Sequence, residues 1–256
     1  MRQTAIYPGL EGKSVFVTGG GSGIGAALTT AFIAQKARVA FVDIADGPSR
    51  ILCEELAAEH GTAPLFLHCD IRDVPALEAA IARAGAENGD IAVLLNNAGN
   101  DERHAVEDVT VEYWDDRMAI NQRPMFFAAQ AVLPQMKRRG GGAIVNFGSI
   151  AWRLGQAVFP AYVTAKASVH GLTRGLARAF GPFNIRVNSL LPGWVMTERQ
   201  LALWMTPEGD AERRAGQCLD LRIQPEDVAA MALFLASDAG RACTSQEFIV
   251  DAGWCN

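Results

Sequence analysis

The sequence predicts a single α/β domain in which helices cover both faces of a parallel sheet of about seven strands. Short apolar runs rich in Val, Ile, Leu and Phe alternate with longer Ala- and Leu-rich segments, which is typical of βαβ units. The chain has 256 residues, of which 50% are hydrophobic, so it can bury one sizeable core. No repeat or Pro/Ser-rich linker divides it, and residues 1–256 are therefore expected to form one domain.

The same alternation assigns the elements in order. The apolar runs predict strands at 14–17, 39–43, 65–69, 91–95, 143–146, 186–190 and 248–250. The segments between them predict helices at 24–36, 49–60, 76–88, 111–137, 161–180 and 225–235. The segment 194–219 carries Pro207, Gly209 and Gly216, and we expect it to be an irregular substrate loop that covers a bound ligand. A surface excursion without a role is the alternative.

Composition excludes several classes of protein. The formal charge is −5 and the longest basic run is 137–139, so no basic stripe is offered to a nucleic acid. The apolar stretches 91–95 and 231–236 are much shorter than the roughly 20 residues of a membrane span. Residues 1–4 lack the apolar core of a secretory signal. We therefore expect a cytoplasmic protein that binds neither nucleic acid nor membrane.

The cysteines and histidines give no sign of a metal site. The five cysteines lie far apart without a C-x-x-C pair, and the four histidines show no H-E-x-x-H spacing. We expect reduced thiols and no structural or catalytic metal.

A glycine-rich turn follows the first predicted strand and opens the first predicted helix. Residues 18–25 read Thr-Gly-Gly-Gly-Ser-Gly-Ile-Gly. Glycine lets the backbone turn tightly and approach a pyrophosphate, which then lies at the positive end of the helix. Such a turn alone is weak evidence, but its place between strand and helix is typical of a Rossmann-type dinucleotide site. The residues expected to contact the cofactor there are Gly19, Ser22, Gly23 and Ile24.

Acidic residues end the second and third predicted strands. Asp43 lies where a carboxylate reaches the adenosine ribose hydroxyls and repels a 2′-phosphate, so NAD is favoured over NADP. The alternative is that Asp43 only caps the following turn. Asp70 is placed to accept a hydrogen bond from the adenine amino group, and it is equally well explained as a plain turn residue. The next residue, Ile71, is also expected to contact the cofactor.

Tyr162 and Lys166 lie four residues apart on a predicted helix, so both side chains share one face. A tyrosine with a pKa of about 10 is a poor base at neutral pH, whereas a nearby ammonium stabilises the phenolate and lowers that pKa. Alone, such a pair is commonplace on protein surfaces. Ser149 strengthens the interpretation, because it follows the fifth predicted strand at the edge where ligands bind.

Six motifs, in order, resemble those of the short-chain dehydrogenase/reductase family over essentially the whole chain. They are Thr18-x3-Gly-x-Gly-Ile-Gly25, Asn96-Asn97-Ala98-Gly99, Asn121, Ser149, Tyr162-x3-Lys166 and Pro192-Gly193-Trp194-Val195-x-Thr197. The resemblance implies a catalytic tetrad of Asn121, Ser149, Tyr162 and Lys166. It also implies that the cofactor is lined by Asn97, Ala98, Gly99, Pro192, Gly193, Val195 and Thr197.

The same resemblance implies a role for each member of the tetrad. Ser149 orients the reacting hydroxyl or carbonyl, and Tyr162 exchanges its proton. Lys166 lowers the tyrosine pKa and binds the nicotinamide ribose, and Asn121 holds a water that links Lys166 to solvent. A hydrogen bond from Asn121 to its own helix backbone is compatible with that role. The family often has Ser directly before the Lys, where this chain has Ala165, but none of the four roles depends on it.

Within the family the chain most resembles bacterial NAD-dependent aldose 1-dehydrogenases of the D-xylose type. The segments that carry this resemblance are 5–8, 42–46, 97–104, 113–115, 138–143 and 251–254. It implies oxidation of the anomeric carbon of an aldopyranose, such as D-xylose, L-arabinose or a related hexose, to a lactone. Because family members of this size usually form tetramers, it also implies a homotetramer.

Several side chains in loops near the expected site are candidates for binding sugar hydroxyls. With Ser149 and Tyr162 they are Asn100, Trp152, Arg153, Gln156 and Trp194. Simple solvent exposure explains Arg153 and Gln156 equally well, and core packing explains the tryptophans equally well. His104 is expected to pack on the loop surface.

Two other functions remain open. Arg153 near the site would clamp the carboxylate of a sugar acid, which keeps a dehydrogenase of a deoxy-keto sugar acid or another secondary alcohol in view. Residues 156–161 also differ from the D-xylose enzymes. A non-catalytic NAD-binding regulator would use the same fold, although the complete tetrad argues against it.

Overall fold

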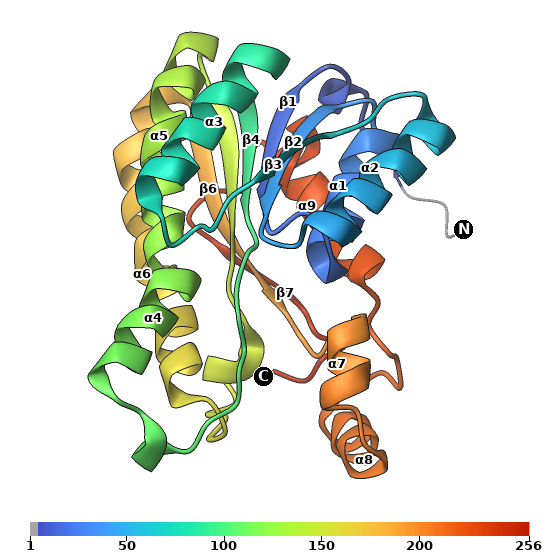
Figure 1. Ribbon diagram of the computed structural model, residues 1–256, viewed down its shortest axis with the longest axis vertical. Coiled ribbons are helices and arrows are strands. Elements are labelled where there is room, and N and C mark those ends of the chain that lie inside the picture. Colours follow the sequence, from blue (N-terminus) through green and yellow to red (C-terminus); the bar gives the residue numbers. More distant parts are fainter. Residues whose placement is uncertain (1–4, 256) are drawn as a thin grey trace.

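The computed structural model describes residues 5–255 as one α/β domain (Figure 1). Its seven parallel strands pair in the order β3-β2-β1-β4-β5-β6-β7, which confirms the predicted fold class. Residues 1–4, on which the expectation of no secretory signal rests, lie outside the described residues. The strands are β1 (Ser14–Thr18), β2 (Arg38–Asp43), β3 (Leu65–His68), β4 (Ile91–Asn96), β5 (Gly142–Phe147), β6 (Ile185–Pro192) and β7 (Glu247–Val250).

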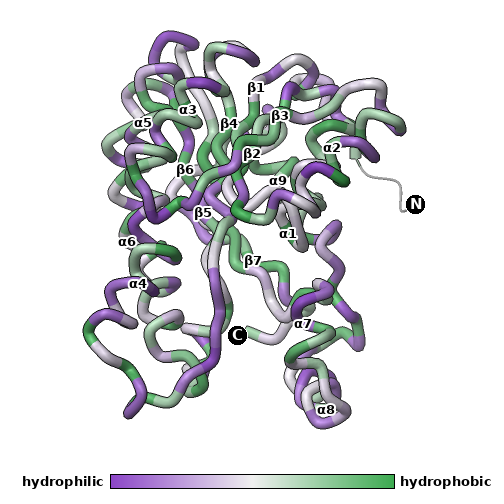
Figure 2. Tube along the Cα trace, viewed as in Figure 1, coloured by the Kyte–Doolittle hydropathy of each residue, from purple (hydrophilic) through white to green (hydrophobic). Residues whose placement is uncertain are grey.

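Helices lie on both faces of the sheet, with α1, α2 and α9 on one face and α3, α5 and α6 on the other. Successive strand residues point to opposite faces, so Val15 and Val17 pack with α1 whereas Phe16 packs with α5. Figure 2 shows the hydrophobic residues concentrated along the strands between the two helical layers. The helices are α1 (Gly23–Ala34), α2 (Asp46–His60), α3 (Val74–Asn88), α4 (Val111–Asn121), α5 (Arg123–Arg139), α6 (Pro160–Phe180), α7 (Glu198–Leu203), α8 (Pro207–Gly216) and α9 (Pro225–Ala236).

The strand order determines where a ligand can bind. The chain runs from β1 outward to β2 and β3, and then returns to pair β4 with the other side of β1. Thr18 at the end of β1 therefore aligns with Val42 of β2 and with Asn96 of β4. In open α/β sheets, ligands bind outside the carboxyl ends of the strands at this reversal.

The predicted helix 111–137 is wrong in one respect, because it consists of two helices, α4 and α5. Gln122 between them has a φ of −135°, which is not helical, and Pro124 lies in the first turn of α5. A proline ring cannot continue a preceding helix without a clash, and it lacks the N–H that would bond backward. The break leaves Asn121 at the end of α4, where its side chain bonds both backbone groups of Asn100, at 2.8 and 3.0 Å.

The prediction of an irregular loop at 194–219 is also wrong, because the segment folds into the short helices α7 and α8. Thr197 caps α7 and Thr206 caps α8, each by accepting a backbone N–H, at 3.3 and 3.1 Å. Arg213 of α8 is only 1% exposed and pairs with Asp210 at 2.9 Å. These contacts stabilise the two short helices beside the carboxyl ends of the strands.

Short 3-10 turns complete the structure, namely η1 (Pro8–Leu10), η2 (Val106–Asp108), η3 (Ile150–Trp152), η4 (Gly181–Phe183) and η5 (Asp238–Gly240). Across residues 5–255, no helix is long and apolar enough to cross a membrane. Nor do three or more His, Cys, Asp or Glu side chains in that range form a group that could hold a metal ion.

Candidate active site

A cavity of about 1170 Å³ lies at the carboxyl ends of the strands. It extends from the ends of β2 and β3 to the start of α6, and α7 and α8 border it. Every residue predicted to bind the cofactor lines it, namely Gly19, Ser22, Gly23, Ile24, Asp43, Asp70, Ile71, Asn97, Ala98, Gly99, Tyr162, Lys166, Pro192, Gly193, Val195 and Thr197. The structure therefore brings these distant parts of the sequence together.

The glycine-rich turn forms one wall of the cavity. Gly19 has a φ of 65°, a left-handed conformation that glycine adopts without the strain of a side chain. A Cβ on Gly25 would lie 1.7 Å from the Gly19 carbonyl oxygen, and one on Gly20 would lie 2.5 Å from the Cβ of Phe41. Any side chain at these positions would push the turn away from the sheet. Glycine thus keeps the turn close to β2, with the N-terminus of α1 beside the cavity.

Thr18 and Asn97 fix that turn to the end of β4. The Thr18 hydroxyl oxygen accepts the N–H groups of Asn97 and Ala98, at 3.0 and 3.1 Å. The Asn97 amide donates to the carbonyls of Thr18 and Gly19, at 3.1 and 3.0 Å. Both walls of the cofactor end are therefore held by hydrogen bonds across the two central strands.

Asp43 holds the backbone on both sides of its carboxylate. Its Oδ2 accepts the N–H of Gly21 at 2.9 Å, and its Oδ1 accepts the N–H of Ala45 at 3.0 Å. The bond to Ala45 caps the turn after β2, which was the alternative role considered for Asp43 from the sequence. A carboxylate has about four acceptor sites, so capping leaves lone pairs for a ligand in the cavity that Asp43 lines.

Asp70 is engaged by a neighbouring arginine. Arg72 donates to its Oδ2 at 2.6 and 2.9 Å, and it also donates to Asp116 at 2.8 Å. The hydrogen bonds from Arg72 lower the pKa of Asp70. This pairing gives Asp70 a part in holding its own turn and leaves fewer of its lone pairs for an adenine amino group.

Tyr162 and Lys166 share the inner face of α6. The Lys166 ammonium donates to the Phe147 carbonyl at 2.9 Å and lies 5.7 Å from the centre of the Tyr162 ring. Phe147 is the last residue of β5, so the strand end positions the ammonium. Burial lowers the pKa of Lys166 to about 8, although the Asp101 carboxylate opposes this shift. The buried Lys166 ammonium therefore gives up its proton more readily than that of an exposed lysine.

The pKa of Tyr162 is raised in the protein without its cofactor, whereas the pairing with Lys166 led us to expect a lowered one. Burial raises the pKa of Tyr162, and the Asp101 carboxylate raises it further, whereas the hydrogen bond with Ser149 lowers it. The sequence argument considered only the nearby cation, but removing water from around a phenolate disfavours the charged form more strongly. Positive charge near the ring, such as that of Lys166, opposes this effect because it stabilises the phenolate.

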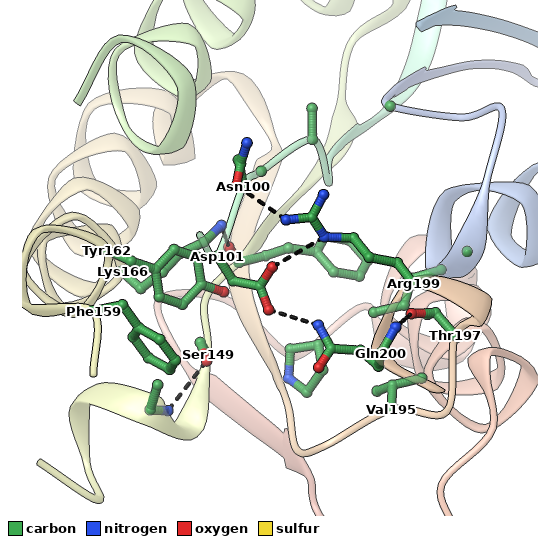
Figure 3. Close-up of a pocket in the computed structure, with 18 of the residues that line it drawn as sticks. Asn100, Asp101, Ser149, Phe159, Tyr162, Lys166, Val195, Thr197, Arg199 and Gln200 are labelled. Atoms are coloured by element: carbon green, nitrogen blue, oxygen red, sulfur yellow. Dashed lines mark hydrogen bonds and ion pairs between the residues drawn. The ribbon is translucent and has the colours of Figure 1, made fainter. Parts of the chain in front are cut away.

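Ser149 and Asn121 complete the predicted tetrad. Ser149 caps the turn η3, and its hydroxyl lies on the same side of the cavity as Tyr162 (Figure 3). Asn121 is fully buried behind the cavity and donates to a carbonyl of its own helix at 3.1 Å, as the sequence left open. A Cβ on Gly99 would lie 3.1 Å from the side-chain amide oxygen of Asn121 and 3.3 Å from the Lys166 ammonium. Asn121 and Lys166 therefore both lie against Gly99, and Asn121 is hydrogen-bonded to the backbone of the next residue, Asn100.

Besides Ser149 and Tyr162, three of the predicted sugar-binding residues line the cavity: Asn100, Gln156 and Trp194. The Trp194 indole N–H donates to the Gln200 side chain at 2.9 Å, so its ring orientation is fixed. These residues come from three different loops, and only the fold brings them to one end of the cavity.

Trp152 and Arg153 do not line this cavity, so we correct their assignment to the substrate end. The Trp152 ring packs against the His170 ring, with centroids 4.6 Å apart, and Arg153 forms an ion pair with Glu247. Ser149 is the extended residue that precedes η3, whereas Trp152 ends this turn and Arg153 follows it. The contacts with His170 and Glu247 hold the Trp152 and Arg153 side chains outside the cavity.

Sequence reasoning missed the residues that close the substrate end. Asp101 reaches from the loop after β4 toward α7, where Gln200 donates to it at 2.6 Å and Arg199 pairs with it at 3.5 Å (Figure 3). Gln200 and Asp101 are 99 residues apart in sequence, so no local pattern links them. Arg103 of the same loop lies over the ring of Trp204, 4.1 Å from its centroid.

His104 does more than pack on the loop surface as expected. Its Nε2 accepts the N–H of Ala161 at 3.3 Å, and its Nδ1 lies 2.9 Å from the Tyr113 hydroxyl. Ala161 directly precedes Tyr162, so His104 caps the first turn of the helix that carries the tyrosine. A histidine 57 residues from its partner gives no such signal in sequence.

The residues present fit a nicotinamide dinucleotide. The glycine turn leaves a cradle that side chains would fill, Asp43 supplies acceptors for ribose hydroxyls, and Lys166 and Tyr162 lie at the other end of one cavity. Fold and site together define a nicotinamide-dependent dehydrogenase of the Rossmann type.

Comparison with known proteins places the chain more narrowly. Residues 19–255 match the family described as Enoyl-(Acyl carrier protein) reductase. The chain is 54% identical over 251 residues to D-xylose 1-dehydrogenase of Caulobacter vibrioides, covering 98% of this chain and 99% of that protein. It is 52% identical over 247 residues to the "Probable galactose dehydrogenase GalD" of Rhizobium meliloti, covering 96% of both. A solved 7α-hydroxysteroid dehydrogenase complexed with NADH and 7-oxo glycochenodeoxycholic acid superposes with a TM-score of 0.90 at 30% identity, covering 95% and 94% of the two chains.

The chain belongs to the short-chain dehydrogenase/reductase family, which confirms the resemblance seen in the sequence. It is therefore an oxidoreductase that acts on CH–OH groups and uses a nicotinamide cofactor.

Proposed function

We propose that the protein is an NAD-dependent sugar dehydrogenase that oxidises the anomeric carbon of an aldopyranose to a lactone. The observation that carries the proposal is the group of Ser149, Tyr162 and Lys166 at one end of the cofactor cavity, next to the polar and aromatic side chains of Asp101 and Trp194. The sugar specificity of relatives more than half identical over nearly the full chain supports the same substrate class.

We assign a step to each residue of this group. Ser149 and the Tyr162 oxygen hold the anomeric hydroxyl, and the Tyr162 phenolate takes its proton. Lys166 keeps positive charge beside that phenolate. The C1–H bond then faces the part of the cavity lined by Gly99 and Pro192. NAD⁺ held in this cavity would supply positive charge and an acceptor for the hydride, and the sugar, having lost one hydride and one proton, becomes a lactone.

Oxidation of a deoxy-keto sugar acid is the less favoured substrate class. That alternative rested on Arg153 as a clamp for a carboxylate, but Arg153 is paired with Glu247 outside the cavity. The group that faces Tyr162 is the carboxylate of Asp101, which repels an anionic substrate.

Cofactor preference follows from Asp43. Asp43 lines the end of the cavity to which we assign the adenosine ribose, and its charge would disfavour a 2′-phosphate there, so kcat/KM is expected to be higher with NAD⁺ than with NADP⁺. Asp43→Ala should relax the preference, and Asp43→Arg should shift it toward NADP⁺. Steady-state kinetics with both cofactors measure the ratio. Equal use of both by the wild-type protein would contradict the assignment.

We also propose a cytoplasmic homotetramer. All five cysteines are free thiols, which suits a reducing compartment. Exposed apolar side chains on α4 and α5 (Val111, Trp114 and Phe126) offer a surface for a second copy. Sedimentation at micromolar concentration should give the mass of four chains, and a monomer would refute the assembly.

The experiment that tests the function is a panel of D-xylose, L-arabinose, D-galactose, sugar acids and simple secondary alcohols with NAD⁺, followed by NADH absorbance. We expect turnover of neutral aldoses with the highest kcat/KM. Turnover of sugar acids alone would agree with the dehydrogenase reaction and would contradict the assignment of an aldose substrate. No turnover of any member, with NADH still bound, would favour a non-catalytic NAD-binding regulator.

A further inference from the structure

The Asp101 carboxylate lies between the catalytic tyrosine and the helix α7. Figure 3 shows its side chain reaching from the loop after β4 into the space between Tyr162 and Gln200. The side chain is 28% exposed, and its charge acts on both Tyr162 and Lys166. A substrate held by Tyr162 must therefore lie next to Asp101.

The contacts of Asp101 leave much of its acceptor capacity unused. Gln200 forms a short hydrogen bond to Oδ2 at 2.6 Å, whereas Arg199 lies 3.5 Å from Oδ1, beyond a normal hydrogen bond. A carboxylate has about four acceptor sites, of which Gln200 fills one. The remaining sites lie at the edge of the cavity that Asp101 lines.

The neighbours of Asp101 hold it in one orientation. The Gln200 amide donates to Asp101 through its nitrogen and accepts the Trp194 indole N–H through its oxygen, at 2.9 Å. A Cβ on Gly209 would lie 2.9 Å from the Trp194 ring, so glycine makes room for the indole beside α8. The chain thus builds an aromatic face, an amide and a carboxylate side by side, a combination that suits the C–H face and hydroxyls of a pyranose.

From this geometry we propose that Asp101 determines substrate specificity by accepting hydrogen bonds from ring hydroxyls of a neutral aldose. The inference rests on the proposed sugar dehydrogenase function and adds a recognition residue to it. Hydroxyl groups that donate to a charged acceptor form stronger bonds than those to a neutral one. A substrate carboxylate in the same place would instead meet a like charge.

The first test combines variants of the enzyme with variants of the substrate. Steady-state kinetics with NAD⁺ compare wild type and Asp101→Ala on D-galactose and its 2-, 3- and 4-deoxy analogues. Losing a hydrogen bond to a charged group predicts a roughly 10–100-fold fall in kcat/KM of Asp101→Ala on D-galactose. For wild type, kcat/KM should be much lower on the deoxy analogue that lacks the bound hydroxyl than on D-galactose. For Asp101→Ala, kcat/KM on that analogue should equal kcat/KM on D-galactose. Asp108→Asn, a carboxylate change on η2 outside the cavity, should behave as wild type.

The inference would be overturned if removing each hydroxyl lowered kcat/KM by the same factor in wild type and in Asp101→Ala. That result would leave the proposed function intact. Failure of the wild type to oxidise any aldose would overturn both. NADH binding by fluorescence verifies that each variant is folded.

Asp101→Asn tests the charge with the shape of the side chain preserved, in case the alanine variant does not fold. D-Galacturonate differs from D-galactose only in carrying a carboxylate at C6. We expect the kcat/KM ratio of galacturonate to galactose to rise at least about tenfold in Asp101→Asn, because the like-charge repulsion is gone. An unchanged ratio would contradict the role of Asp101.

Discussion

Replacing Tyr162 with Phe is expected to lower kcat by roughly 10²–10⁴-fold while NADH binding is retained. The change removes only the hydroxyl that exchanges the proton, and the ring keeps its edge-on packing against Phe159, with centroids 5.3 Å apart. Steady-state kinetics on an aldose and fluorescence titration with NADH measure the two quantities separately.

A matched control is Tyr7→Phe, which removes a hydroxyl next to η1 and outside the cavity. Its kcat should equal that of the wild type. If Tyr162→Phe keeps more than about a tenth of the wild-type kcat, Tyr162 is not the acid/base.

Lys166→Met is expected to produce the second large loss, again at least about 10²-fold in kcat. Methionine is similar in length but carries no charge, so both the hydrogen bond to Phe147 and the cation beside Tyr162 disappear. Without that cation the phenolate is less stable and the pKa of Tyr162 rises further, so the residual activity should increase only at higher pH than in the wild type. Loss of a ribose contact should also raise the KM for NAD⁺.

A pH–rate profile of Lys166→Met, with Lys137→Met at the far end of α5 as control, measures the shift. A profile that coincides with that of the wild type would show that Lys166 does not stabilise the phenolate.

The sheet was predictable from the sequence because parallel strands covered on both faces are apolar runs throughout. The β1 strand shows this plainly, since every residue from Ser14 to Thr18 is buried. The break between α4 and α5 was less visible, because one proline at 124 can lie in a first turn or inside a helix. The helices α7 and α8 carry Thr caps at 197 and 206, and these are local signals that the Gly and Pro content of the segment obscured.

The cofactor end and the tetrad were predictable because their residues occur in short motifs at strand ends. The substrate end was not, because Asp101 and Gln200 meet only through the fold. The positions of the Trp152 and Arg153 side chains depend on contacts with His170 and Glu247, which sequence spacing does not give. The raised pKa of Tyr162 comes first from burial, a property that a Tyr and Lys four residues apart do not reveal.

The most direct test of the account is the fate of the hydrogen at the anomeric carbon. With [1-²H]-D-galactose and NAD⁺, the proposed function predicts that the deuterium appears in the reduced nicotinamide ring and that the sugar product is an unlabelled lactone. Mass spectrometry of one reaction mixture measures the deuterium content of both the sugar product and the reduced cofactor. Deuterium retained in the sugar product, with unlabelled NADH, would show that another carbon is oxidised and would contradict the account.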